Sequence, residues 1–255
     1  WDIAGKAAGL PIYKMMGGAQ PNEIPAYASL LKYQNPDVCA RLTEEALERG
    51  YRFIKLHEDT VEPVAAARAV GGDELPIMLD VNCSWSPPQA TAMAESLAPY
   101  DLHWLEEPLW PPENFEALAG LRAESGIPIA AGENACTAWQ FDQMFKDGAV
   151  DYAQPSVTKI GGLTEMRKVA TLAEVANVRI QPHSPYFGPG FLATLHFIAS
   201  SRDIESIERF YVDLEADMYG NTLDPVNGFV RVPDGPGLGI DPDPEFIKKY
   251  RTDSG

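Results

Sequence analysis

The chain has 255 residues, of which 45% are hydrophobic, and its 20 Lys and Arg against 37 Asp and Glu give a formal net charge of −17. This length and apolar content allow one large domain with a substantial core. The acidic balance argues against nucleic acid as a partner, and no apolar run approaches the roughly eighteen residues that would span a membrane.

The cysteines are few and widely spaced. Cys39, Cys83 and Cys136 are an odd number and form no CxxC pair. We therefore expect neither a disulfide framework nor a zinc site, and a reducing, cytoplasmic location is the natural interpretation. The chain opens without methionine, at Trp1, on a pattern typical of the middle of a helix. We expect a further segment before it, so this start carries no information on targeting.

A short apolar segment followed by a helical pattern recurs along the chain, at a spacing of about twenty-five residues from Phe53 onward. Candidate strands begin near Ile24, Phe53, Ile77, His103, Ile127, Tyr152, Val178 and Ile204. Candidate helices between them include Thr60 to Val70, Pro88 to Leu97 and Leu163 to Ala176. Such alternation is typical of parallel βαβ units, and eight units close into a barrel. The predicted fold class is therefore an α/β barrel.

Three consecutive candidate strands end in acids. The segment at 77–82 reaches Asp80, the segment at 104–108 reaches Glu106 and Glu107, and the segment at 127–134 reaches Glu133. In an α/β barrel the reacting groups lie at the carboxyl ends of the strands. Carboxylates this close repel one another unless a cation neutralises them, and hard oxygen ligands suit Mg²⁺. The pattern predicts a magnesium site, in which either Glu106 or Glu107 is a ligand.

Basic and polar groups at other strand ends suggest proton transfer. Lys55 and His57 are two residues apart, so both can face the barrel mouth from one strand. His183 follows the seventh strand, and Glu208 ends the eighth. We expect His196 to be packed within a helix and assign no role to His103.

Together these segments resemble the mandelate racemase and muconate lactonizing branch of the enolase superfamily. The resemblance covers nearly the whole chain and is carried by Trp1-Asp2 with Gly5-Lys6, Lys55-x-His57, Leu79-Asp80-x-Asn82, Leu105-Glu106-Glu107-Pro108, Gly132-Glu133-Asn134, Lys159-Ile160-Gly161-Gly162, His183 and Glu208. It implies a modified (β/α)7β barrel with remnants of an α+β capping domain. Residues 1–20 would end the capping domain or its linker, 21–225 would form the catalytic barrel, and 226–255 would pack towards the capping domain.

The resemblance also implies roles for individual residues. The proposed Mg²⁺ ligands are Asp80, Glu106 and Glu133. The resemblance therefore selects Glu106 rather than Glu107 as the ligand after the fourth strand. Lys55 would neutralise the substrate carboxylate, and Glu208 would hydrogen-bond it from the opposite side. Four further residues are expected to contact the metal ligands and the catalytic side chains from behind and to orient them. These are Asn82, Asn134, Ser156 and Lys159.

Two positions depart from the family pattern. His57 stands where the second lysine of a Lys-x-Lys motif is common, and Ser156 stands where racemase-like members have an aspartate that orients the histidine after strand seven. Lys159, three residues further on, is not assigned the role of the catalytic lysine of the lactonizing branch. Without that aspartate His183 lacks its expected partner, which favours a one-base reaction.

The leading hypothesis is a Mg²⁺-dependent lyase that removes the proton beside the carboxylate of a sugar acid, forms an enediolate and expels the β-hydroxyl as water. His57 would be the base and His183 the acid, or the reverse. The alternatives are a cycloisomerase or a racemase or epimerase on the same scaffold, a metal-independent glycosidase with two carboxylates, and a non-catalytic barrel.

Expected partners are a small carboxylate substrate and further copies of the chain, with no nucleic acid and no membrane. The segment from Pro185 to Gly188 would line the pocket or pack beside it.

Overall fold

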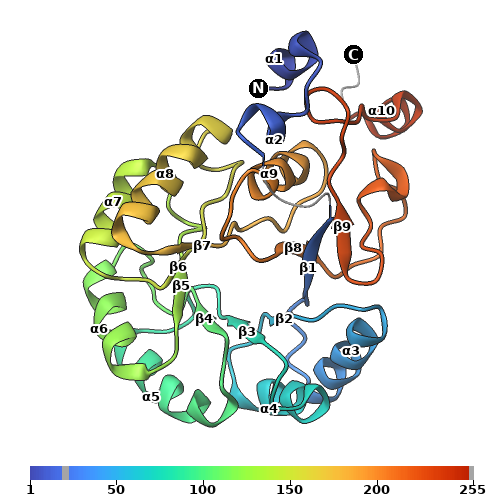
Figure 1. Ribbon diagram of the computed structural model, residues 1–255. Coiled ribbons are helices and arrows are strands. Elements are labelled where there is room, and N and C mark those ends of the chain that lie inside the picture. Colours follow the sequence, from blue (N-terminus) through green and yellow to red (C-terminus); the bar gives the residue numbers. More distant parts are fainter. Residues whose placement is uncertain (19–22, 253–255) are drawn as a thin grey trace.

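The computed structural model describes residues 1–18 and 23–252. Eight parallel strands form an inner ring, and helices surround it (Figure 1). The strands of the ring are β1 (Glu23–Ser29), β2 (Ile54–Leu56), β3 (Ile77–Asp80), β4 (Trp104–Glu106), β5 (Ile129–Ala131), β6 (Tyr152–Ala153), β7 (Arg179–Ile180) and β8 (Ile207–Phe210). Each begins within three residues of its predicted start.

Seven helices connect these strands and lie outside the ring (Figure 1). They are α3 (Pro36–Glu48), α4 (Val61–Gly71), α5 (Pro87–Leu97), α6 (Phe115–Ser125), α7 (Ala138–Lys146), α8 (Leu163–Ala176) and α9 (Pro189–Ala199). The sequence sets their ends locally. For example, the Asn35 side chain accepts the backbone N–H groups of Asp37 and Val38, and Pro36 takes the first helical position of α3. The architecture is the predicted (β/α)7β barrel.

The strand order is β7-β6-β5-β4-β3-β2-β1-β8. Within the described residues, no backbone ladder joins β7 to β8, and the two are connected by side chains instead. Gln181 Nε2 donates to the carbonyl of Ser206 at 2.8 Å, and Glu208 Oε2 accepts the backbone N–H of Ser184 at 2.9 Å. Glu208 therefore helps to close the ring, and it is the second residue of β8, not the last as the sequence predicts, because the strand continues to Phe210.

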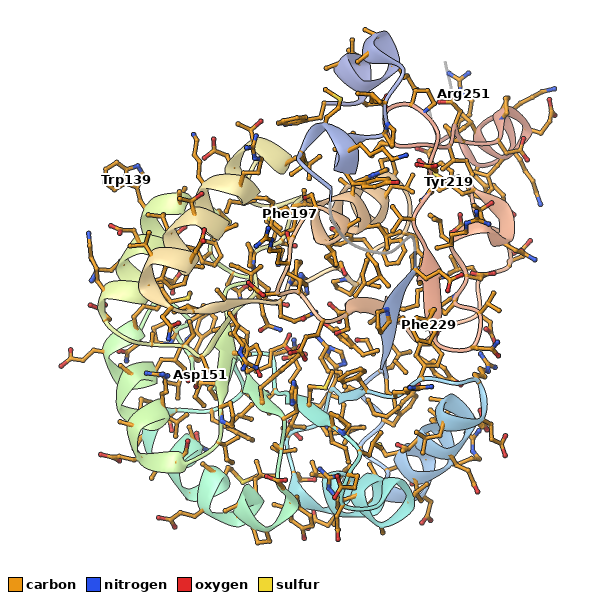
Figure 2. All side chains as sticks on the ribbon, viewed as in Figure 1. Trp139, Asp151, Phe197, Tyr219, Phe229 and Arg251 are labelled. Carbon is orange, nitrogen blue, oxygen red and sulfur yellow. The ribbon has the colours of Figure 1, made fainter. Side chains whose placement is uncertain are left out.

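Successive side chains of each strand point to opposite faces, so the apolar residues form two separate clusters. Tyr27, Met78, Trp104, Ala130 and Tyr152 form a cluster inside the ring, whereas the neighbouring strand residues pack against the helices. Figure 2 shows that side chains fill the space within the ring. On β2, Ile54 and Leu56 belong to the outer cluster, so the intervening Lys55 faces inward. Inward-facing residues near the carboxyl ends of the strands consequently meet at one end of the barrel.

The two ends of the described chain lie side by side (Figure 1). The helices α1 (Asp2–Ala8) and α2 (Ile12–Met15) contact the segment before α10 (Pro244–Tyr250), where Asp2 Oδ1 accepts the N–H of Leu238 at 2.8 Å. The short strand β9 (Phe229–Arg231) pairs antiparallel with the start of β1. Two 3₁₀ turns, η1 (Ala98–Tyr100) and η2 (Gly220–Leu223), complete the elements of the described residues.

His196 connects the barrel to α2 and to the segment before α10. The histidine is fully buried in α9, and its ring bonds the backbone N–H of Tyr13 at 3.3 Å and the carbonyl of Leu238 at 3.0 Å. This confirms the predicted packing role. No helix in the described parts of the chain is long and apolar enough to span a membrane.

Candidate metal centre and active site

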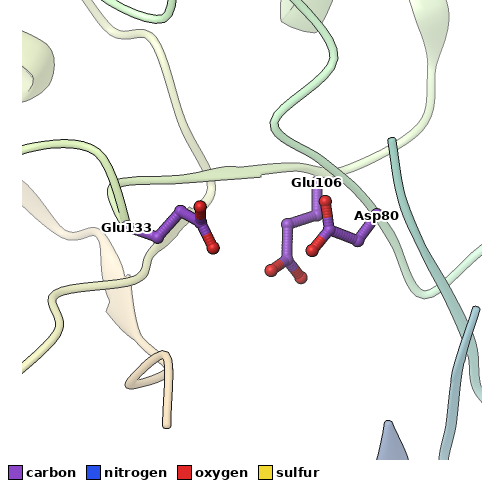
Figure 3. A group of neighbouring side chains, drawn as sticks. All are labelled: Asp80, Glu106 and Glu133. Carbon is purple, nitrogen blue, oxygen red and sulfur yellow. The ribbon is translucent and has the colours of Figure 1, made fainter. Parts of the chain in front are cut away.

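Three carboxylates converge at the carboxyl ends of neighbouring strands. Asp80 and Glu106 are the last residues of β3 and β4 and stand opposite each other in the ladder register. Glu133 follows β5 after Gly132, whose φ of +133° and close contact with Phe141 leave no room for a side chain. One oxygen of each carboxylate lies within 4.8 Å of the others. Figure 3 shows Glu133 reaching towards Asp80 and Glu106 from the opposite side of the group.

Glu107 has a different environment, although it follows Glu106 directly. It adopts a left-handed conformation with φ of +43°, and its carboxylate accepts the backbone N–H of Gly132 at 2.8 Å. Burial raises the pKa of Glu107 to about 7. This glutamate therefore supports the turn that carries Glu133, and Glu106 is the member of the close group.

A buried lysine lies in the middle of the acids. Lys55 is fully buried, and its Nζ lies 2.9 Å from Glu106 Oε1, 2.7 Å from Glu208 Oε1 and 3.5 Å from Asp80 Oδ2. Glu208 is held from its other sides by the Ser29 hydroxyl, at 2.8 Å, and by the N–H of Ser184. One ammonium thus bridges carboxylates from three strands.

Burial and charge act against each other in this cluster. Burial alone would raise the pKa of Asp80 and of Glu208. The Lys55 ammonium, a neighbouring histidine and a backbone N–H together outweigh burial and hold both pKa values below their usual range. Burial raises the pKa of Glu106, and Lys55 offsets this effect only in part. Burial would lower the pKa of Lys55, whereas the surrounding carboxylates raise it. The carboxylates outnumber the nearby permanent cations, and a divalent cation would balance the charge.

Two histidines flank the carboxylates from opposite sides. His57 Nε2 lies 3.2 Å from Asp80 Oδ2, and its Nδ1 contacts the carbonyl of Leu30. His183 Nε2 lies 2.6 Å from Glu133 Oε2. Burial by itself would lower the pKa of each imidazole, but the hydrogen bond to its carboxylate raises it. Each histidine can therefore hold or release a proton beside the group of acids.

The other predicted residues have different positions. The backbone N–H of Asn82 donates to Asp80 Oδ1 at 2.9 Å, and Ser156 Oγ lies 3.0 Å from His183 Nδ1. Lys159 Nζ is 3.8 Å from Glu133 Oε1 with a side chain that is 40% exposed. Asn134 is exposed and donates to Cys83 Sγ at 3.6 Å.

Some residues of the site are not indicated by the sequence analysis. Trp104 Nε1 donates to Glu106 Oε2 at 2.8 Å, and strand alternation is a usable signal for it, because Trp104 lies two residues before Glu106 on the same face. Ser29 and Ser184 carry no such signal, since their positions depend on how the ring closes and on loop conformation. Tyr186 lies in the segment expected to line the pocket or pack beside it, and its hydroxyl contacts Ser156 at 2.7 Å.

Comparison with known proteins agrees with this geometry. The family model "Enolase C-terminal domain-like" matches residues 38–246. The chain is 35% identical to 3,6-anhydro-alpha-L-galactonate cycloisomerase of Streptomyces coelicolor, over 94% of this chain and 66% of that protein. It is 30% identical to arabinonate dehydratase of Saccharolobus solfataricus, over 100% of this chain and 70% of that protein.

A solved structure has the same fold and holds a metal. It is a racemase from Streptomyces coelicolor A3(2) with bound magnesium, at 31% identity and a TM-score of 0.85, covering 98% of this chain and 69% of that one. The matched family spans most of the sequence, and both relatives align over nearly all of it. The chain therefore belongs to the enolase C-terminal domain-like family, within the mandelate racemase and muconate lactonizing branch of the enolase superfamily.

Proposed function

We propose that this protein removes the proton beside the carboxylate of a sugar acid in a Mg²⁺-dependent reaction and then expels the β-hydroxyl as water. The observation that carries the proposal is the arrangement of proton-transfer groups around the acids. His57 bonds Asp80 on one side, and His183 bonds Glu133 on the other. A substrate held at the three carboxylates would therefore have an imidazole on each side.

The side chains fit a magnesium ion. Asp80, Glu106 and Glu133 supply hard oxygen donors from three separate strand ends within 4.8 Å, and Mg²⁺ prefers such donors together with water and substrate oxygens. When bound, the ion would polarise the substrate carboxylate and stabilise the negative charge that develops on proton removal. The magnesium in a similar solved structure supports this choice of metal.

Lys55 would bind the substrate carboxylate next to the metal, and Glu208 would hold the Lys55 ammonium in place. The Lys55 ammonium is held between Glu106 and Glu208 and cannot reorient freely, since its side chain is fully buried. It would place positive charge beside the same carboxylate on which negative charge increases during the reaction. Such preorganised charge lowers a barrier without the cost of reorienting solvent.

His57 would remove the proton, and His183 would donate a proton to the departing hydroxyl. We base this assignment on the group that contacts Nδ1 of each imidazole ring. His57 Nδ1 contacts the carbonyl of Leu30, which fixes a proton there and leaves Nε2 to accept one. His183 is backed by the neutral hydroxyl of Ser156. A neutral hydroxyl at His183 Nδ1, in place of a carboxylate, favours a single base over racemisation.

A cycloisomerase is the second candidate, and a specific observation favours it. The relative at 35% identity is named as a cycloisomerase of an anhydro-sugar acid, whereas the relative at 30% is named as a dehydratase of a sugar acid. Both begin from a sugar acid, so the substrate class is common to the two candidates. They differ in the fate of the substrate after the proton is removed.

A screen of sugar acids and their lactones with MgCl₂, read by mass spectrometry, tests the proposal. Dehydration predicts a product lighter by one water, and cycloisomerisation predicts a product of unchanged mass. In D₂O an epimerase would place deuterium into inverted substrate without loss of water. Turnover that persists after exhaustive chelation would reject the proposal and favour a metal-independent glycosidase.

A further inference from the structure

The loop that follows β1 is joined to the residues that follow β2. The two strands are parallel neighbours, with Ser29 opposite Lys55, and the backbone N–H of Leu30 donates to the carbonyl of Lys55 at 2.9 Å. His57 Nδ1 contacts the carbonyl of the same Leu30. The next residue, Glu58, reaches further along this loop, to residues 33 and 34. Two consecutive residues after β2 therefore hold the loop at two points.

The Glu58 carboxylate is buried in a cradle of backbone N–H groups. The residue is 1% exposed, and its Oε1 accepts the N–H of Tyr33 at 2.8 Å and that of Gln34 at 3.1 Å. Its Oε2 lies 3.0 Å from the same N–H of Gln34. Gln34 has a φ of +54°, and a left-handed residue turns successive N–H groups towards one point, which makes a concave site for an anion. The loop is therefore shaped around this carboxylate.

A thiol completes the surroundings of Glu58 Oε1. Cys39 Sγ, in α3, donates to this oxygen at 3.4 Å. Burial, together with the neighbouring carboxylate, raises the pKa of Cys39 to about 12, so the thiol keeps its proton at neutral pH. One carboxylate thus connects the end of β2, the loop after β1 and the helix that follows the loop.

We propose that Glu58 is a positioning residue, which keeps the imidazole of His57 in place by fixing the loop that carries the Leu30 carbonyl. This carbonyl belongs to the third residue before Tyr33, whose N–H Glu58 holds. A displacement of the loop at Tyr33 therefore reaches the carbonyl through a short stretch of chain. Glu58 acts on the position of the ring and not on its charge. The consequence for catalysis rests on the proposed function, in which His57 removes the proton.

Nuclear magnetic resonance tests the position of the loop and of the ring without substrate. Glu58→Met removes both oxygens from a side chain of similar length, so the amides of Tyr33 and Gln34 should exchange with solvent roughly 10-fold faster or more. The His57 ring stands at 82° to that of Phe210, with 6.5 Å between the centroids. Its carbon-bound ring protons should therefore change in chemical shift when the imidazole moves. An unchanged His57 signal in Glu58→Met would overturn the proposal, whatever the amide exchange rates.

The chain offers a matched control and a second variant. Asp59→Asn removes an ion pair to Lys32 of the same loop, at 2.6 Å, between side chains that are 27% and 42% exposed. Such a pair contributes little, so this variant should leave the His57 signal unchanged. Gln34→Val keeps Glu58 but disfavours the left-handed backbone, whereas Gln34→Gly accepts it. If Glu58→Met does not fold, the comparison of these two variants replaces it, and equal His57 signals in both would overturn the proposal.

Kinetics separate positioning from a loss of general stability. In protein that circular dichroism shows to be folded, Glu58→Met should lower kcat by roughly 10- to 100-fold, with KM near the wild-type value. Glu58→Gln keeps one oxygen to accept the two N–H groups and should restore most of the kcat. In a His57→Ala background, Glu58→Met should lower kcat no further, because the ring on which it acts is already missing. The same additional loss in both backgrounds would reject the role of Glu58.

The positioning role and the reaction can fail separately. If no sugar acid is turned over but the His57 signal moves in Glu58→Met and stays in Asp59→Asn, the proposed function is wrong and the positioning role stands. If sugar acids are turned over and Glu58→Met retains the wild-type kcat and His57 signal, the proposed function stands and the positioning role is rejected.

Discussion

Replacing Lys55 by methionine removes the one ammonium that lies among the buried acids and leaves a side chain of similar length. Its Nζ contacts Glu106, Glu208 and Asp80, and all four side chains are at most 1% exposed. Removing one partner of a buried ion pair costs about 3–5 kcal/mol, since the remaining charge stays buried without compensation. For a domain of this size each 1 kcal/mol corresponds to about 2–4 °C in Tm, so we expect a decrease of roughly 6–20 °C in metal-free protein.

The same reasoning gives a pH dependence. Lys55 helps to hold the pKa values of Asp80 and Glu208 below their usual range, so its contribution is fully present above about pH 4.5. The contribution is lost as the pH falls through the lowered folded-state values. The loss of stability in Lys55→Met should therefore be larger at pH 7 than at pH 4.

Differential scanning calorimetry in EDTA measures both effects. The matched control is Lys168→Met, because Lys168 pairs with Glu165 on the surface at 2.6 Å and its side chain is 59% exposed. Such a pair contributes less than about 1 kcal/mol. If Lys55→Met and Lys168→Met shift Tm by the same small amount, the buried ion cluster is not the stabilising unit described above.

Further substitutions test the catalytic assignment and the packing of the chain. His57→Ala should lower kcat by about 10²- to 10⁴-fold in protein that circular dichroism shows to be folded at the assay temperature, and retained turnover would remove it as the base. Asn35→Ala deletes the cap of α3 and should cost about 1 kcal/mol in urea unfolding; an unchanged midpoint would show that the cap does not matter. His196→Phe leaves the Tyr13 N–H and the Leu238 carbonyl without their partner and should cost about 1–3 kcal/mol for each group left buried, which equal stability in guanidinium would contradict.

Much of the fold could be predicted because its signals are local. Helix α8 has the predicted bounds, Leu163–Ala176, since Gly162 and Asn177 at its two ends adopt positive φ angles of 93° and 55°. The fifth strand begins at Ile129, two residues later than predicted. Pro128 has no backbone N–H to donate, so the ladder starts after it.

The candidate site was only partly predictable, for the same physical reason. Acids at the ends of apolar runs identify Asp80, Glu106 and Glu133, because strand ends meet at one end of a barrel. The bond between Ser29 and Glu208 joins residues 179 positions apart and depends on β1 pairing with β8. No pattern along the chain encodes the register of that closure.

Titration of the metal-free protein with MgCl₂ by calorimetry tests the central claim most directly. We predict one bound Mg²⁺ per chain and a large loss of affinity in Glu106→Gln. Glu107→Gln should still bind one ion, because Glu107 faces the Gly132 amide instead of the other acids. No detectable binding by the wild-type protein, or loss of binding in Glu107→Gln with retention in Glu106→Gln, would contradict the account.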